Sequence, residues 1–582
     1  MLINYLIMNK FLPYLTSIFL GCTFIISITG VSNELFNSQY LSTIFGTCFA
    51  SLIACIVSLL YQTNNDVRVS LLDIFILLFL FWYWININNV NSIYNIGYIC
   101  LILLYCSIRY IPKIQYDVLY WCCIISSLIL SIWGYLQQYN LLPSPNPNFS
   151  VTGPFYHPAF YGLTLSAYLC INFHIIKFHL RNQNQKLIYL FIEISCFIIG
   201  IPALILSESR TACIALVISI IIPYVIQYIN NHTSKRIIIV ILTSITFFIL
   251  LIVSYTFKPI SADGRLLIWK VSCKMIKDKP IAGHGKGGFE AKYLYYQADY
   301  LSNKGNDSEK YIAGNTHVAF NEVIKITVEH GILGLTIYAT FIFILIKTKY
   351  RHTVYVLISQ SILLLIFIQG LFSYPNIIFS IILIGTIALA VLARSAYHSQ
   401  KYIKISQRYI CIIIFVSVIP LFSLTYKRFL NYHSLYNDIQ NTYKIKSYSN
   451  FNKYLCDLKG DNIFLLFYIG LMSKDKNYTE QLNYISILEK KYPTSSLIIL
   501  KGDLLRKKTL LNEAEKMYKL AANMVPSLQQ ARGRLVFLYK EMGKQQEAYQ
   551  LARELMSEKV KNYGFNTFKL HQKLKDEFPN IK

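Results

Sequence analysis

Thirteen apolar stretches, each long enough to cross a lipid bilayer, dominate the first 425 residues of the chain. A transmembrane helix needs about 20 mostly apolar residues, because in lipid the backbone must satisfy its own hydrogen bonds. The pattern predicts an all-α, polytopic membrane helix bundle with 12–13 spans. The first stretch could imitate a signal peptide, but it lacks a small-residue cleavage site and many spans follow it. The predicted spans are 11–30, 40–61, 69–87, 93–111, 118–135, 158–176, 187–206, 211–229, 237–257, 323–346, 353–372, 376–392 and 409–424.

Charged residues make up only 14% of the chain, whereas a soluble globular protein usually contains about 25%. This excludes a water-soluble enzyme as the main body of the molecule. Lysine and arginine outnumber aspartate and glutamate by 55 to 29, which on a soluble protein would suggest nucleic-acid binding. Many of these cations stand in short loops between apolar stretches, where membrane topology explains them, so we expect no nucleic-acid partner.

The thirteen cysteines show neither a disulfide framework nor a metal-ligand spacing, because most lie in apolar stretches and no CxxC pair occurs. We therefore expect no metal site. The glycine-rich run 283–288 follows no predicted strand and is not a Walker pattern. A tight turn is the simpler interpretation, with Lys286 as a secondary phosphate contact.

Loop charge predicts the orientation in the membrane. One set of alternate loops carries fifteen lysines and arginines, whereas the short loops of the other set carry one, Arg210. By the positive-inside rule the N terminus is cytoplasmic and the long loop 257–322 lies on the outer face. With thirteen spans the C-terminal domain lies outside as well. The histidines on or near the outer face are then His157, His284, His317 and His330.

Residues 430–582 return to the polarity of a soluble domain, so we predict two domains, a membrane domain at 1–425 and a soluble domain at 430–582. Ala514 and Ala548 mark a period of about 34 residues, and Gly502, Tyr518 and Pro526 keep its spacing. This resembles tetratricopeptide repeats, in which small residues let paired helices pack closely. The alternative is a generic helical hairpin domain. Under either interpretation, residues 430–582 suggest a docking surface for a protein partner rather than a catalytic site.

The loop 257–322 carries an ordered set of motifs, and loops of this length tend to be functional. It contains R-x3-W at Arg265–Trp269, P-x-x-G-x-G-x-x-x-F at Pro280–Phe289, and a His/Asn stretch at His317–Asn321 before a G-x-x-G pair. Two further motifs lie upstream, S-x-S-R at Ser207–Arg210 and G-x-F-x-H-P at Gly153–Pro158. Four tyrosines at positions 293, 295, 296 and 300 suggest an aromatic belt at the membrane surface.

These five motifs, in this order and at outer-face positions, resemble the O-antigen ligase and polymerase superfamily. The resemblance implies a bacterial inner-membrane glycosyltransferase that takes a glycan from undecaprenyl diphosphate without a metal or other cofactor. It also implies that two outer-face arginines, here Arg210 and Arg265, and one histidine are central. Phe320 occupies the usual histidine position, so we assign that role to His317, with His284 in reserve. If this part of the loop is helical, residues 317 and 320–321 share a face.

The residue types suit this chemistry. The leaving group of the donor is a diphosphate, and a guanidinium binds phosphate oxygens bidentately while staying protonated. The acceptor hydroxyl needs a general base, which histidine can provide. Structural roles are the alternatives: a helix-end Arg210 paired with Glu208, a loop Arg265 paired with Asp263, or a capping His317. Secondary candidates for the site are His157, Glu208, His284, Lys286, Asn321 and Glu322.

We predict ligase-type transfer to an acceptor hydroxyl of lipid A–core or of a protein on the periplasmic side, as part of lipopolysaccharide and cell-envelope biosynthesis. The alternative within the class is a polymerase, whose acceptor is another carrier-linked glycan. A lipid-linked glycan transporter is the alternative of another class. Transporters usually place their binding residues at the membrane midplane, whereas the candidates here cluster at the outer face. A non-catalytic assembly scaffold is a third option.

Overall fold

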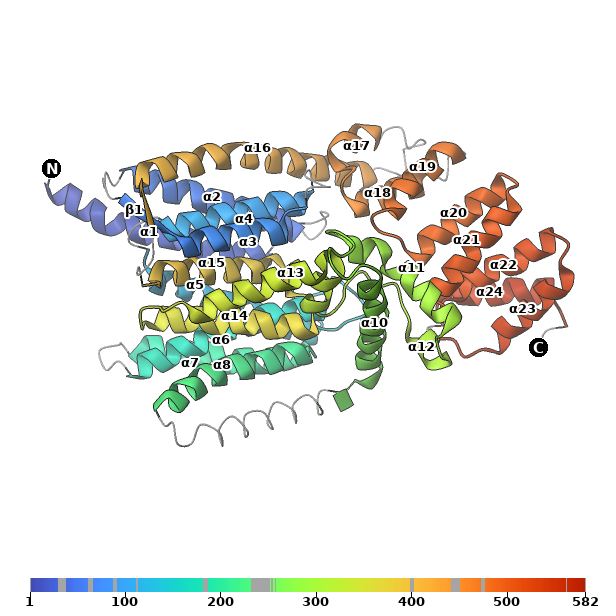
Figure 1. Cartoon of the computed structure of the whole chain (residues 1–582), viewed down its shortest axis with the longest axis horizontal. Helices are drawn as coiled ribbons and strands as arrows, with labels where there is room; N and C mark the ends of the chain where they lie inside the picture. Colours follow the sequence, from blue (N-terminus) through green and yellow to red (C-terminus); the bar gives the residue numbers. More distant parts are fainter. Residues whose placement is uncertain are drawn as a thin grey trace. The chain divides into compact units, whose positions relative to one another are not determined.

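The structure is a computed structural model, and it describes residues 2–29, 38–60, 66–86, 92–110, 114–181, 187–231, 252, 255–256, 258–397, 402–440, 451–472, 477–561 and 563–580. Helices dominate it (Figure 1). Within these ranges nine helices are long and apolar enough to cross a membrane, and four shorter apolar helices accompany them. The predicted all-α, polytopic membrane fold is confirmed.

The chain divides into two compact units. Unit 1 comprises Met1–Ser254 and Ile337–Asn441, and unit 2 comprises Tyr255–Thr336 and Thr442–Lys582. The whole predicted outer-face loop, 257–322, therefore groups with the C-terminal residues. The two-domain division between residues 425 and 430 stays a prediction.

Unit 1 is a bundle of apolar helices that follow the predicted spans. Together with α13 (Glu322–Lys347), whose second half belongs to unit 1, they account for twelve of the thirteen. The ninth predicted span, 237–257, lies outside the described residues except for positions 252, 255 and 256. The other helices are α1 (Leu2–Thr29), α2 (Ser38–Leu60), α3 (Leu71–Trp84), α4 (Ile93–Tyr110), α5 (Tyr116–Gln138), α6 (Pro158–Arg181), α7 (Leu187–Leu206), α8 (Arg210–Asn231), α14 (Val354–Phe372), α15 (Phe379–Ser395) and α16 (Gln407–Gln440).

Small residues allow these helices to approach one another closely, as is usual where lipid supplies no hydrophobic driving force. A Cβ atom on Gly97 of α4 would lie 2.3 Å from the ring of Phe379 in α15. A Cβ atom on Gly200 of α7 would lie 2.5 Å from Leu169 in α6. Glycine at these two positions is therefore what lets a large neighbour fill the contact.

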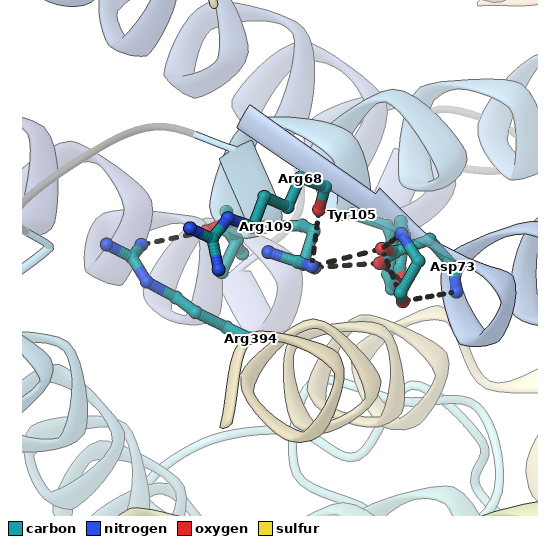
Figure 2. A network of polar contacts seen from close by, with 7 residues as sticks. Arg68, Asp73, Tyr105, Arg109 and Arg394 are labelled. Carbon is teal, nitrogen blue, oxygen red and sulfur yellow. Dashed lines mark hydrogen bonds and ion pairs between the residues drawn. The ribbon is translucent and has the colours of Figure 1, made fainter. Parts of the chain in front are cut away.

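A buried polar network closes one end of unit 1 (Figure 2). Asp73, in the first turn of α3, accepts hydrogen bonds from the Arg109 guanidinium at 2.7 and 3.0 Å and from the Tyr105 hydroxyl at 3.0 Å. The same carboxylate accepts from the N–H and hydroxyl of Ser70, which cap α3 in a capping box. A buried charge is tolerated when it is paired and fully hydrogen-bonded in this way.

A two-stranded antiparallel sheet lies at the same end, formed by β1 (Asp66–Ser70) and β2 (Tyr402–Ser406). Arg109 donates to the carbonyl of Arg68 in β1 at 3.2 Å, and Arg394 at the end of α15 donates to the carbonyl of Ile108 at 3.3 Å (Figure 2). The contacts join segments from loops that the sequence predicts to be cytoplasmic. The side of the membrane that this end faces stays a prediction.

The opposite ends of the same helices are joined by a second set of contacts. Asn376, in the short helix η3 (Pro375–Ile377), donates to the hydroxyl of Tyr83 at the end of α3 at 2.8 Å. Tyr40 in α2 donates to the carbonyl of Ile377 at 2.9 Å. The motif segments 153–158 and 207–210 lie at this end, where α6 and α8 begin.

Unit 2 folds the predicted outer-face loop into helices and packs them with the C-terminal helices. One hydrophobic core runs from α10 and α11 into α20–α24. The helices of unit 2, besides the first half of α13, are α10 (Pro259–Asp278), α11 (Gly288–Asn303), α12 (Asp307–Ile312), α17 (Asn452–Leu458), α18 (Asn462–Met472), α19 (Tyr478–Glu489), α20 (Ser495–Lys507), α21 (Leu511–Met524), α22 (Gln529–Glu541), α23 (Gln545–Ser557) and α24 (Phe565–Glu577).

The predicted aromatic belt at the membrane surface is wrong. Tyr293 is fully buried and Tyr300 is only 7% exposed, and both belong to the shared core. Tyr295 donates a hydrogen bond to Glu489 and Tyr296 donates one to Asp278. The physical reason is that protein, chiefly α21, covers the apolar face of α11 that the sequence suggested for the membrane surface.

The C-terminal helices pack in antiparallel pairs through small residues, as the 34-residue period suggests. A Cβ atom on Gly502 of α20 would lie 2.6 Å from the ring of Tyr518 in α21. Ala514, Ala521 and Ala548 are fully buried. The assignment of these pairs to tetratricopeptide repeats stays a prediction.

Candidate active site

The turn between α7 and α8 places Arg210 at the first position of a 22-residue helix. Glu208 has a positive φ of 52°, and the Ser207 hydroxyl donates to the carbonyl of Leu204 at 2.6 Å and accepts from the N–H of Ser209 at 3.2 Å. Arg210 is partly buried. A helix N terminus attracts anions through its free N–H groups and its dipole, and a guanidinium at that position adds a full positive charge.

Helix α6 presses against this turn. A Cβ atom on Gly162 would lie 2.6 Å from the Ser209 Cβ and 2.7 Å from the Ser207 hydroxyl. Only glycine fits at position 162 without a shift. The start of α6 therefore fixes the turn that carries Arg210.

His157 comes directly before α6. Its Nδ1 accepts from the N–H of Ala159 at 3.1 Å and lies 3.4 Å from the Tyr374 hydroxyl. The rings of Phe149, Phe160 and Tyr374 surround the imidazole, and burial lowers the pKa of His157. This arrangement gives His157 a capping role at the helix start, with its ring neutral at pH 7.

In unit 2, Arg265 of α10 lies over the ring of Phe320, with 5.3 Å between the guanidinium carbon and the ring centroid. Trp269, one turn further along α10, donates from Nε1 to the carbonyl of Ala319 at 3.0 Å. The R-x3-W motif thus binds α10 to residues 319–320. Phe320 itself has a positive φ of 52°.

His317 points elsewhere. Residues 313–321 are irregular rather than helical, so the expectation that 317 and 320–321 share a helix face is wrong. Ala313 is the C-cap of α12, and no helix or strand forms from there until α13 begins at Glu322. The His317 ring stacks on Tyr492, with 3.6 Å between centroids. Both ring nitrogens are buried, and burial lowers the pKa of His317 to about 4, although the nearby backbone of Glu290 acts in the opposite direction.

Asn321 and His284 are held by structural contacts. The Asn321 side-chain oxygen accepts from the N–H of Ile324 at 3.0 Å, so it caps α13. The Nε2 of His284 lies 2.9 Å from the carbonyl of Met275, and its Nδ1 lies 3.4 Å from Lys292 Nζ. His284 is therefore engaged on both sides, which weakens it as the reserve base.

The glycine-rich run forms turns, as predicted, and fills a break in α13. At Gly331 the helix is interrupted, with φ 63° and ψ −159°. The N–H groups of Ile332 and Leu333 donate to the carbonyls of Pro280 and Ile281, and those of His284 and Gly285 donate to the carbonyls of Val328 and Glu329. These four bonds replace the interrupted helical ones and hold the run against α13.

Residues 195–339 match the model of a protein family described as O-antigen ligase. This segment belongs to the O-antigen ligase family. It covers about a quarter of the chain, from within α7 into α13. No curated protein matches the chain.

The O-antigen ligase segment contains Arg210, Arg265 and His317, together with the secondary candidates Glu208, His284, Lys286, Asn321 and Glu322, whereas His157 lies before it. Arg210, Glu208 and His157 belong to unit 1, and the others belong to unit 2. The structure brings Arg265 to Phe320 rather than to His317. Among the described residues no group of His, Cys, Asp and Glu suits a metal ion.

Sequence reasoning missed a charge cluster in the ligase segment, formed by Lys286, Glu290, Glu322, Lys325 and Glu329. Their charges act on one another, and Glu329 also accepts from the N–H of Gly287 at 3.1 Å. Burial lowers the pKa of Lys286 and raises that of Glu290. The spacing of 322, 325 and 329 puts three members on one face of α13, which is the signal that could have revealed the cluster.

Proposed function

We propose that the protein is a ligase-type membrane glycosyltransferase, which moves a glycan from undecaprenyl diphosphate to an acceptor hydroxyl of lipid A–core or of a protein on the periplasmic side. The observation that carries this proposal is the O-antigen ligase segment, since it contains both arginines and the histidine. The position of Arg210 at the start of α8 supports a role in anion binding.

In this proposal Arg210 and Arg265 bind the diphosphate of the donor. Charge grows on that diphosphate as the bond between the sugar C1 and the phosphate oxygen breaks, and guanidinium groups stabilise it without changing their own protonation. The acceptor oxygen forms the new bond to C1, and its proton passes to His317. Burial lowers the pKa of His317 to about 4, so its imidazole is neutral at pH 7, as a general base must be, but is a weaker base than free histidine. Direct displacement inverts the configuration at C1.

The charge cluster around Lys286 offers a second group of side chains for the same substrate. Glu322 and Glu329 are almost completely buried, and the charges of both act on Lys286. We assign the cluster to orienting the loop and contacting the phosphate through Lys286. We assign Asn321 to capping α13 beside it.

Glycan profiling of a deletion strain tests the proposal. The strain is complemented with the wild type, Arg210→Ala, Arg265→Ala or His317→Ala, and with Arg351→Ala as a control at the other predicted face. We expect the first three variants to remain in the membrane and to lose product, whereas the control keeps it. A strain in which Arg210→Ala and His317→Ala both restore full product would contradict a transferase and favour a scaffold.

The same profile separates the acceptors. Loss of long chains from lipid A identifies a lipid A–core ligase, and glycans missing from proteins identify a protein glycosyltransferase. Shortened chains on an otherwise normal acceptor identify the polymerase alternative. A transporter would instead leave the purified protein without transfer activity when donor and acceptor are supplied in detergent.

A further inference from the structure

The C-terminal helices and the loop helices of unit 2 share one core, so they are not separate modules. From α11, the buried side chains Phe289, Tyr293 and Leu294 belong to the same cluster as Ala514 and Tyr518 of α21. The sequence predicts a docking module, which would keep a core of its own. A shared core means that the loop helices depend on the C-terminal helices for the burial of their apolar face.

Gln297 of α11 is the polar centre of this contact. It is 1% exposed, and its side-chain oxygen accepts from the Tyr293 hydroxyl at 2.9 Å. Its amide nitrogen donates to the carbonyl of Gly314 at 3.1 Å and to that of Met524 at 2.6 Å. One side chain thus joins α11, the segment before α13 and the end of α21.

The segment 312–319, which carries His317, is bound along its length by residues of the C-terminal region. Lys561 donates to the carbonyl of Ile312 at 3.0 Å, and the Ser527 hydroxyl donates to that of Ala313 at 3.2 Å. The N–H of Ser495 donates to the side-chain oxygen of Asn315 at 3.0 Å.

Two more contacts complete the set. Tyr492 stacks on the His317 ring, and Trp269 binds the carbonyl of Ala319. Tyr492 precedes α20, so the stack also comes from the C-terminal residues. The backbone of residues 313–321 has no regular structure of its own, and these external contacts therefore set its course.

We propose that the C-terminal helices position the predicted outer-face loop, and that Gln297 and Tyr492 are positioning residues which fix segment 312–319. This inference rests on the proposed function, in which His317 accepts a proton during glycan transfer and its position therefore affects the rate. It assigns the C-terminal helices a part in the reaction, beyond the binding of a protein partner.

Gln297→Met tests the proposal on the full chain, because methionine keeps the length of the side chain and removes all three hydrogen bonds. Gln481→Met is the matched control. Gln481 is also fully buried and donates from its amide to the carbonyl of Ile469 at 2.9 Å, but this bond stays between α19 and α18. Both variants lose a buried amide, and only the first loses a contact with segment 312–319.

Hydrogen exchange across residues 288–319 is measured by mass spectrometry, together with product formation from lipid-linked donor. In Gln297→Met we expect exchange to rise at least about tenfold and product formation to fall about tenfold to a hundredfold, because small misplacements of a reacting group have large effects. Gln481→Met should match the wild type in both. Unchanged exchange, or faster exchange with full product formation, would overturn the proposal. A wild type that makes no product at all would instead overturn the proposed function, whatever the exchange shows.

Variants of Tyr492 provide a second test, whose result distinguishes the positioning of His317 from a general loss of stability. Tyr492→Phe keeps the stacked ring and should retain kcat, whereas Tyr492→Ala should lower kcat about tenfold with the donor KM unchanged. Equal loss in both variants, or a change confined to KM, would show that the ring does not position His317.

Discussion

Arg210 combines two sources of positive potential, its own guanidinium and the N terminus of α8. We predict that Arg210→Lys keeps a charge there but loses bidentate geometry, so product formation falls about tenfold. Arg210→Ala should fall about a hundredfold to a thousandfold, the usual effect of removing one electrostatic contact to a transition state. Initial rates with purified protein and lipid-linked donor measure both. Equal rates for the two variants would contradict the prediction, because they would mean that a positive charge at position 210 does not by itself raise the rate.

The buried His317 also makes a prediction for stability. Its folded-state pKa of about 4 lies below the ordinary value of 6.5, so the stabilisation from a neutral buried imidazole is complete above pH 6.5. It is lost as the pH falls from 6.5 towards 4, because the unfolded state then binds more protons. The unfolding temperature should therefore decrease more between pH 6.5 and pH 4 in the wild type than in His317→Phe. Phenylalanine keeps the stack on Tyr492 but has no group that titrates. Thermal unfolding in detergent at matched pH values provides the comparison.

Gly331 has a backbone conformation that is essentially restricted to glycine, with φ 63° and ψ −159°. A Cβ atom there would lie 2.1 Å from the carbonyl oxygen of Ile281. We expect Gly331→Ala to destabilise the protein by about 1–3 kcal/mol from backbone strain alone. Gly470→Ala is the control, since a Cβ atom at that helical glycine meets nothing within 4 Å. A similar unfolding temperature for both variants would show that the break in α13 is not needed.

At the scale of helices and strands, the buried pair of Asp73 and Arg109 joins α3 to α4. Asp73→Ala leaves a buried guanidinium without its carboxylate, and breaking such a pair costs about 3–5 kcal/mol. Asp117→Ala removes an exposed carboxylate that accepts from Tyr355, and we expect a much smaller effect. Unfolding temperature and membrane yield are the measurements. A loss in Asp73→Ala no larger than in Asp117→Ala would contradict the importance of the network.

The spans were predictable from the sequence because apolar length alone specifies a membrane helix, and α2–α8 and α13–α15 follow the predicted ranges within a few residues. Helix α1 begins nine residues before its predicted range, and α16 continues 16 residues beyond its own. The amphipathic face of α11 was not assigned correctly, because a stripe of tyrosines looks the same whether lipid or protein covers it. Only the tertiary contact of Tyr293 and Tyr300 with the C-terminal helices decides between them.

The candidate site shows the same limit. Motif spacing selected Arg210, Arg265 and His317, but it gave no information on side-chain direction. The irregular course of 313–321 turns His317 towards Tyr492, and no local periodicity encodes a contact between residues 175 positions apart. The charge cluster around Lys286 was missed because its members come from two separate segments.

At the scale of the whole molecule, the chain crosses between the two units three times, and one crossing lies inside α13. Unit 2 contains both the loop helices and the C-terminal helices on which we propose that they depend. We predict that a chain truncated after residue 441 inserts into the membrane but exposes the apolar face of α11. Residues 258–322 should then be cleaved rapidly in limited proteolysis, and product formation should be lost. A truncated chain with wild-type protection and activity would exclude the positioning role.

The antiparallel sheet joins β1 to a strand about 340 residues further along the chain. At a translation rate of about 5–20 residues per second, β2 leaves the ribosome roughly 20 to 70 s after β1. During that interval β1 presents an unpaired strand edge, while the capping box of α3 beside it can already form. Closure of the bundle at this end is therefore a late event in biosynthesis, because it requires a strand that follows α15 in the chain.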